Sequence, residues 1–298
     1  MPQVQSADVR APRRRSAVAS FFVRLVKEKP LGFASGMVIV LLLLVAVFGG
    51  YVSPYPYNEI HLIDRLQGPS ANYLLGTDQA GRDLLSRLIF GARISVLVGL
   101  AVTTISIVVS TLIGGVSGFV GGKLDLTVQR FVDAWNAFPG LLLLLTMMAI
   151  VGKGLLQIIL VMGISGGIGG ARVIRGAVIG IKENVYFDVA EAIGSPRWRS
   201  LIRHVVPNIM PVIIISFSTS IGGVIMALAS LGFLGYGLPP NIPDWGGMLS
   251  RDGRKYMELA PRLALWPGLC LTVTIYSLNM FGDAVRDLLD PRLRGGGR

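Results

Sequence analysis

Long stretches without a charged side chain alternate with short charged segments along this chain. Six such stretches contain no Asp, Glu, Lys or Arg, namely residues 33–52, 94–120, 134–152, 154–171, 209–243 and 263–282. A helix needs about 20 mostly apolar residues to cross the hydrocarbon core of a bilayer, so each stretch predicts one membrane-spanning helix. The fifth stretch is too long for one helix, and its glycines and prolines after Leu234 predict that the helix stops near residues 230–236.

The composition supports a membrane protein over a soluble one. Residues of the set AVILMFWYC make up 52% of the 298 residues, charged residues make up 15%, and the mean hydropathy is +0.63. Soluble chains carry about 25% charged residues. The 38 glycines suit helices whose backbones pack closely, and the pairs Gly114/Gly118, Gly118/Gly122, Gly163/Gly167 and Gly176/Gly180 have the spacing that allows this. We therefore expect an all-α membrane protein.

The positive charges predict the orientation of the chain. With the N-terminus inside the cell, the inner segments hold 19 of the 28 Lys and Arg residues and the outer loops hold 9. Basic residues are retained on the cytoplasmic side, so both termini are predicted to be cytoplasmic. The net charge of +11 then lies almost wholly at the inner surface, which indicates contact with membrane lipid and not with nucleic acid.

The segment before the first stretch is expected to remain attached as a cytoplasmic tail, because more than 30 residues precede the apolar run. Apolar residues 21, 22, 25 and 26 alternate there with Arg24, Lys27 and Lys29, which predicts a short helix on the inner leaflet, while a disordered tail is equally compatible up to Ser16. We expect four parts: a tail (1–32), the first helix with its outer loop (33–93), a core of five membrane helices (94–283) and a C-terminal tail (284–298).

The chain lacks the residues of an enzyme or of an ATP-binding protein. His61 and His204 both lie in predicted loops, so no histidine metal cluster can form within the bilayer. The two Gly-Lys pairs, at 122–123 and 152–153, fail the phosphate-binding pattern G-x-x-x-x-G-K-[ST]. We predict no catalytic residue, metal site or cofactor in this chain, so energy for transport must come from a gradient or from another polypeptide.

The cytoplasmic segment 172–208 is too long for a tight turn and predicts a helical finger. Residues 185–193 can form one short helix that Gly194 breaks, and Ser195 with Pro196 can start a second helix that ends at Pro207. Such a finger would serve as a docking element, and a solvated basic loop is the alternative.

The finger resembles a known motif. The stretch Tyr186-Phe187-Asp188-Val189-Ala190-Glu191-Ala192-Ile193-Gly194, followed by His204-Val205-Val206-Pro207-Asn208, is similar to the EAA loop of binding-protein-dependent ABC importer permeases. Further matches narrow the resemblance to the C-type subunit of the dipeptide, oligopeptide and nickel subfamily: Leu75 to Asp78, Gly81 to Asp83, Gly91 to Ser95, Ala137 to Pro139, Leu231 to Gly237, Trp245-Gly246, Gly282-Asp283 and Leu289 to Leu293. The matches run from about residue 30 to residue 294.

The resemblance implies a type I importer (MetI-like) bundle of six membrane helices in the bacterial inner membrane. It implies four kinds of partner: a second homologous permease, two ATPase subunits that bind ATP and Mg, an extracytoplasmic substrate-binding protein, and membrane lipid. The residues implied to contact the ATPase are Tyr186, Asp188, Ala190, Gly194 and Pro196. Asp188-Val189-Ala190 stands where the family has Glu-Ala-Ala, so the acidic charge is kept. Arg197, Arg199 and Arg203 would pair with acidic groups of the partner or with the inner leaflet.

The implied solute is a peptide or a similar small molecule, with nickel or opine-like solutes as alternatives. Ser216, Ser218, Thr219 and Ser220 are candidates to line the pathway, although such hydroxyls often only bond their own backbone. Leu228 stands where relatives often carry an acidic residue, which leaves a polar feature of the pathway in question.

Two points concern the outer side and the energy source. The outer segment 76–87 either packs on the bundle or meets the receptor, and Tyr51, Tyr236, Trp245 and Trp266 are expected to anchor the membrane interface. A gradient-driven carrier is the alternative function, but it would ask for ionisable groups at mid-membrane, and Asp133 and Asp283 fall near inner ends.

Overall fold

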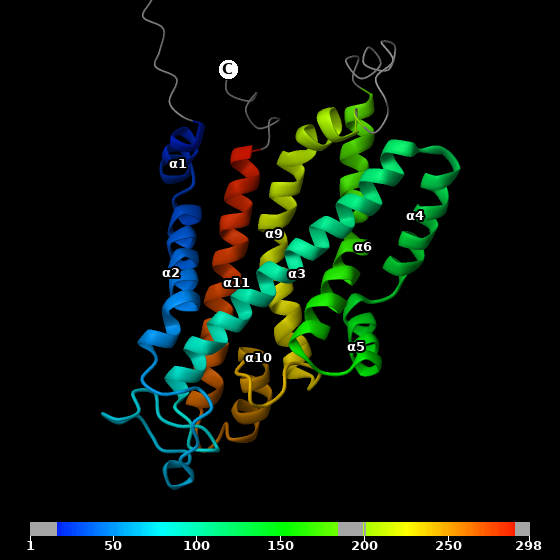
Figure 1. Ribbon diagram of the computed structural model, residues 1–298. Helices are drawn as coiled ribbons and strands as arrows, with labels where there is room; N and C mark the ends of the chain where they lie inside the picture. Colours follow the sequence, from blue (N-terminus) through cyan, green and yellow to red (C-terminus); the bar gives the residue numbers. More distant parts are fainter. Residues whose placement is uncertain (1–16, 184–198, 200, 290–298) are drawn as a thin grey trace, which may run out of the picture.

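The chain folds as a bundle of long helices (Figure 1). The computed structural model describes residues 17–183, 199 and 201–289. In that part of the chain five helices are long and apolar enough to cross a membrane, and their bounds are α2 Pro30–Val52, α3 Leu84–Val120, α6 Leu155–Lys182, α9 Val206–Phe233 and α11 Arg262–Leu289. A sixth span exists if α4 Gly122–Ala137 and α5 Gly140–Val151 cross as one bent unit.

The third charge-free stretch does not form one helix, so the single span predicted over 134–152 is wrong. Helix α4 ends at Ala137, α5 begins at Gly140, and the two are bent by 91°. Phe138 has extended backbone angles (φ −82°, ψ 140°) because the ring of Pro139 disfavours the helical region for the residue before it. Most of α4 occupies a segment that was expected to be a connection, and its Asp125 and Asp133 bond to α6.

Helix α3 begins at Leu84, earlier than the predicted start at residue 94. The Asp83 side chain caps the helix by accepting a hydrogen bond of 2.7 Å from the Ser86 amide. Arg87 lies inside the first turns and is 1% exposed, because its charge is matched by Asp78 at 3.4 Å. The charge-free stretch leaves out the first turns of α3, because Arg87 carries a charge there even though Asp78 pairs with it.

The fourth and fifth spans are confirmed, with one correction at Pro207. The π-helical turn η2 Leu201–Val205 leads directly into α9, and Pro207 lies in the first turn of α9. The predicted second finger helix therefore does not end at Pro207, because proline is well tolerated where the amide has no intrahelical partner. The predicted stop is confirmed: α9 ends at Phe233, and Gly235 has a positive φ of 84°.

The two ends of the bundle differ in what they hold (Figure 1). Helix α1, Ala17–Glu28, lies beside the last turns of α11, where Leu25 packs on Ala284 and Leu288, and Lys29 Nζ lies 2.5 Å from Asp287 Oδ2. This end is called the terminal end. The opposite loop end holds the 3₁₀ turn η1 Leu62–Asp64, the short helix α10 Trp245–Met248 and the π-helical turn η3 Leu249–Gly253. The predicted N-terminal helix thus forms.

Helices α3 and α6 cross at the centre of the bundle with their backbones in close approach (Figure 1). A side chain on Gly114 would overlap the Ala171 carbonyl of α6, and an added Cβ on Gly163 would lie 2.7 Å from Ile105 of α3. Small residues therefore set this crossing, as their spacing predicted. Apolar side chains on the outer faces, such as Met37 and Val47, stay exposed, as expected for contact with lipid.

Candidate solute pathway and coupling region

A cavity of about 520 Å³ opens between α3, α6, α9 and α11 in the half of the bundle nearer the terminal end. Hydroxyl groups of Ser106, Ser110, Ser216, Thr219 and Ser220 belong to its lining. Two charged side chains, Asp283 and Arg286 of α11, also line it. The wall of this cavity is mostly apolar but carries these hydroxyl groups, one acid and one base.

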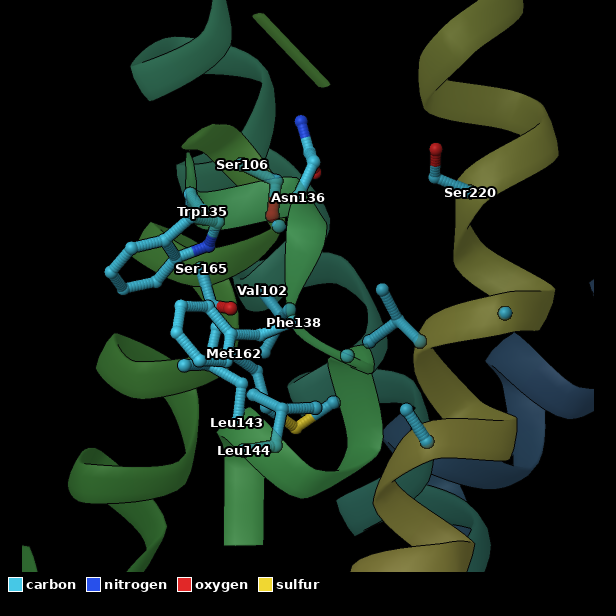
Figure 2. A pocket seen from close by; sticks show the side chains of 15 residues that line it. Val102, Ser106, Trp135, Asn136, Phe138, Leu143, Leu144, Met162, Ser165 and Ser220 are labelled. Atoms are coloured by element: carbon cyan, nitrogen blue, oxygen red, sulfur yellow. The ribbon is translucent and has the colours of Figure 1, made fainter. Parts of the chain in front are cut away.

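A second cavity, of about 530 Å³, lies nearer the loop end and is shown in Figure 2. Trp135, Asn136, Phe138 and Ser165 lie on one side of it, and Ser220 of α9 lies on the other. The described residues that line it include none with a formal charge. The two cavities share Ser106, Gly166 and Ser220, so they adjoin along α9. The two cavities therefore form one candidate route whose mostly apolar walls carry separate polar groups.

Three of the four hydroxyl residues expected along α9 line these cavities, and Ser218 lines neither. The Ser218 hydroxyl donates to the Ile214 carbonyl at 2.9 Å, and the Thr219 hydroxyl donates to the Ile215 carbonyl at 2.9 Å. Both hydroxyls satisfy the backbone of their own helix. Ser216 and Ser220 are thus the more available polar groups of the four.

Leu228 takes no part in the route. It is 2% exposed and packs with Val98, Val102 and Met162 in the apolar core between α3, α6 and α9. Neither cavity includes it among its lining residues. An acidic residue at this position would therefore lie in the apolar core, where an unpaired carboxylate is costly, and would line neither cavity.

The coupling residues predicted from the finger, namely Tyr186, Asp188, Ala190, Gly194 and Pro196, lie outside the described residues, as does Arg197. Arg199 and Arg203 are described and exposed. The chain enters the finger from α6, whose last turn is fastened to α3 by a hydrogen bond of 2.7 Å from Lys182 Nζ to the Phe119 carbonyl. Closer to the start of α6, Arg175 pairs with Asp125 of α4, and Arg172 pairs with Asp133 of α4.

The segment 76–87 packs on the bundle, where Leu84 lies in an apolar cluster with Trp245 and Leu263. Contact of this segment with a receptor stays a prediction. Asp78 is 1% exposed and pairs with Arg82 at 2.7 Å and with Arg87 at 3.4 Å. Asp78 also accepts hydrogen bonds from the amides of Ala80 and Arg82, at 2.8 and 3.0 Å. The segment therefore forms a rigid charged core at the loop end.

Two buried carboxyl groups complete this charged core. Burial raises the pKa of Asp252, and the negative charge of Asp78 raises it further. Burial also raises the pKa of Asp244, whose side chain accepts a hydrogen bond of 2.8 Å from the Gly247 amide and so caps α10. Nearby, a hydrogen bond to Asp64 raises the pKa of Tyr73 to about 12.

Trp245 is a buried packing residue and not an interface anchor, which corrects the sequence prediction. It is 2% exposed, and its indole Nε1 donates to the Leu88 carbonyl at 3.1 Å. Gly91 makes room for the ring, because an added Cβ would lie 2.7 Å from the indole. Tyr51, in contrast, is 91% exposed, as an anchoring residue would be.

Asn136, Trp135 and Ser165 are site residues that the sequence reasoning missed. They come together because α4, whose last turn carries Trp135 and Asn136, packs on α6, which carries Ser165. An available signal was the uncharged polar residue directly before the Ala-Phe-Pro segment. As to metals, the part of the chain that the structure describes holds no group of three or more His, Cys, Asp or Glu residues placed to bind an ion.

Comparison with known proteins identifies the family. A model of the binding-protein-dependent transport system inner membrane component matches residues 110–295, and a model of the N-terminal TM domain of oligopeptide transport permease C matches residues 20–69. The glutathione transport system permease protein GsiD of Pectobacterium atrosepticum is 34% identical over 99% of this chain and 96% of its own length. The dipeptide transport system permease protein DppC of Alkalihalophilus pseudofirmus is 34% identical over 90% of this chain and 88% of its own.

The fold is shared with a solved transporter. The chain in an inward-facing structure of the MetNI methionine ABC transporter superposes with a TM-score of 0.56 at 17% identity, over 68% of this chain and 96% of that one. At this identity the likeness concerns the fold alone, and it agrees with the expected MetI-like bundle. Since a family model covers more than half of the chain and curated relatives match it nearly from end to end, this protein belongs to the family of binding-protein-dependent transport system inner membrane components, the permease subunits of ATP-driven importers.

Proposed function

We propose that this permease carries peptides or a peptide-like solute such as glutathione into the cell. The observation that carries the proposal is the match over nearly the whole chain to permeases named for glutathione and for dipeptides. The candidate route along α9, with its hydroxyl and carboxamide groups, supports the same solute class, since such groups can bond peptide amides. Nickel and opine-like solutes are the alternatives to be tested.

The proposed pathway is completed by a second, homologous permease. Both cavities open at the surface of this chain; Ser220 of α9 lines both, and Ser216 and Thr219 line the one nearer the terminal end. A route through a membrane must be closed off from lipid, because polar groups facing hydrocarbon are costly. A partner of the same fold that covers this face would close the route and leave its polar groups facing the solute.

Coupling to ATP is proposed to run through the finger between α6 and η2. Asp188 and Gly194 would contact an ATPase subunit that binds ATP and Mg, with Tyr186, Ala190 and Pro196 beside them. The contacts near the end of α6 support this role, because Lys182 links that helix to α3 and Arg175 links it to α4. A push on the finger would then move three helices together as one body.

The proposed orientation places the terminal end in the cytoplasm and the loop end outside, in the inner membrane of a bacterium. The basic residues of the inner segments support it, and so does the position of α1 and the last turns of α11 at one end of the bundle. The loop end would then face the extracytoplasmic substrate-binding protein. Single cysteines placed at Ser53 and at Arg286, in a Cys270→Ala background, test this arrangement. Their accessibility to an impermeant thiol reagent is measured.

One experiment tests the transport function. The chain is tagged and purified from its native membrane in mild detergent, and the co-purifying proteins are identified by mass spectrometry. We expect a second six-helix permease and two ATPase subunits. Deletion of the gene should abolish ATP-dependent uptake of labelled dialanine or glutathione, and re-expression should restore it.

Two results would contradict the proposal. Uptake that continues after ATP depletion, with the proton gradient preserved, would favour a gradient-driven carrier. The assembled complex could instead take up nickel but neither peptide nor glutathione. That result would contradict the proposed solute class and leave the ATP-driven mechanism in place.

A further inference from the structure

The polar side chains around the two cavities differ in how they use their hydrogen-bonding groups. The Ser106 hydroxyl donates to the Gly163 carbonyl at 3.0 Å, and the Ser110 hydroxyl donates to the Ile107 carbonyl at 3.1 Å. The side chains of Asn136, Ser165 and Ser220, in contrast, have no hydrogen-bond partner among the described residues, and all three line the cavity in Figure 2. This cavity therefore presents unused polar groups.

These three residues line the same cavity from three helices. Asn136 comes from the last turn of α4, Ser165 from α6, and Ser220 from α9 (Figure 2). Trp135, Phe138 and Met162 supply the apolar wall. Gly169 leaves room for the carboxamide, because a Cβ added there would lie 3.3 Å from Asn136 Oδ1.

Asn136 and Ser220 are exposed and Ser165 is partly exposed, so their unbonded groups are open to a solute in the cavity. A cavity of about 530 Å³ lies within the range of about 300–1,000 Å³ that small-molecule sites occupy. Small-molecule sites also have mostly apolar walls that carry a few fixed polar groups, as this cavity does. The carboxamide offers one acceptor and two donors, which match both halves of a peptide amide.

We propose that Asn136, Ser165 and Ser220 form a neutral contact site for the transported solute and that Asn136 sets the charge preference of the permease. This inference rests on the proposed transport function and adds a selecting step within the membrane. A cavity whose lining residues carry no formal charge favours a neutral part of the solute, since a charge placed there would lose hydration without a counter-charge in the cavity wall.

Substitutions of opposite charge at one position separate a contact role from a structural one. Asn136→Asp should favour alanyl-lysine over alanyl-glutamate, and Asn136→Lys should reverse that preference. We expect the ratio of the two maximal uptake rates to change about tenfold in each direction, because a difference of about 1.4 kcal/mol between an attracted and a repelled solute corresponds to that factor. A purely structural position would slow all solutes together.

The measurement uses the complete transporter, with the permease variants expressed in cells that lack the native gene. Because the receptor selects solutes before delivery, uptake is measured at concentrations that saturate the wild-type system. Thr127→Asp and Thr127→Lys are the matched controls: Thr127 lies on the same helix, is exposed, donates to the Lys123 carbonyl and lines neither cavity. These controls should leave the ratio unchanged.

Each outcome decides the proposal. Opposite shifts at Asn136 with unchanged ratios at Thr127 would support it, and equal ratios in all variants would overturn it. Co-purification of the ATPase subunits checks that each variant assembles; if the Asn136 variants do not, Ser220→Asp and Ser220→Lys on the facing helix provide the same test. A wild-type system that takes up no peptide would instead refute the proposed function itself.

Discussion

Arg175 of α6 holds Asp125 of α4 through two parallel hydrogen bonds. Nε donates to Oδ1 and Nη2 donates to Oδ2, each at 2.6 Å. The Asp125 side chain is 14% exposed, so the pair is partly shielded from water. A two-bonded Arg–carboxylate pair fixes the relative direction of both groups, and here it fixes α4 against the helix that leads into the coupling finger.

The first prediction concerns this pair. Asp125→Asn removes the charge while keeping the shape, and it should destabilise the α4–α6 contact by about 2 kcal/mol, the range of hydrogen bonds to charged groups. The melting temperature of the purified protein in detergent should fall by about 5 °C. Arg130→Ala is the control, because the Arg130 side chain is 77% exposed and lies 3.9 Å from Asp133. Equal melting temperatures for Asp125→Asn and the wild type would contradict this role.

The second prediction concerns the crossing of α3 and α6. Gly114→Ala places a methyl group against the Ala171 carbonyl and should force the helices apart, at a cost of about 1–3 kcal/mol for overpacking. Gly115→Ala is the matched control, because a Cβ there meets no heavy atom within 4 Å. Thermal unfolding followed by circular dichroism should show a lower melting temperature for the first variant only. A similar loss in both would mean that the close crossing at Gly114 is not responsible, since helix propensity alone favours Ala over Gly at both positions.

The third prediction concerns the coupling finger. Gly194→Val should leave membrane insertion intact and abolish uptake, because a branched side chain restricts the backbone where the finger needs a break. Gly194 lies outside the described residues. Gly176→Val serves as the control within α6, since a Cβ at Gly176 meets no heavy atom within 4 Å. Normal uptake by Gly194→Val would remove the role assigned to this glycine.

The fourth prediction concerns the charged core at the loop end. The folded pKa of Asp252 is raised by burial and by Asp78, although Arg87, Arg82 and Arg251 act in the opposite direction. A carboxyl group whose folded pKa exceeds its unfolded value disfavours folding once it ionises, so its cost is present above the folded pKa and vanishes below the unfolded one.

Asp252→Asn should therefore raise the melting temperature at pH 7.5, and the difference should shrink as the pH falls toward about 4, the pKa of an unfolded Asp. Asp287→Asn, at a half-exposed pair with Lys29, should show no such gain at pH 7.5. An Asp252→Asn protein that melts below the wild type at pH 7.5 would mean that the arginine partners outweigh burial.

The spacing of charges and apolar residues determines much of this protein by itself. The runs that became α2, α6, α9 and α11 were long and uncharged enough to identify without tertiary information, because a bilayer demands a minimum apolar length. The glycine pairs of α3 and α6 predicted a close crossing for a similarly local reason, since only a residue without a Cβ allows backbones to touch. Family motifs spread along the chain likewise identified a permease.

Only the tertiary structure decided which polar residues meet. The packing of α4 on α6 places Asn136 at the same cavity as Ser165 and Ser220, and the fold of the loop end buries Arg87 beside Asp78. Both relationships join residues on different elements, and their distances depend on how helices pack and not on any local pattern. A sequence shows that a charge or an amide is present, whereas the packing of distant segments determines whether it is paired, buried or free to meet a solute.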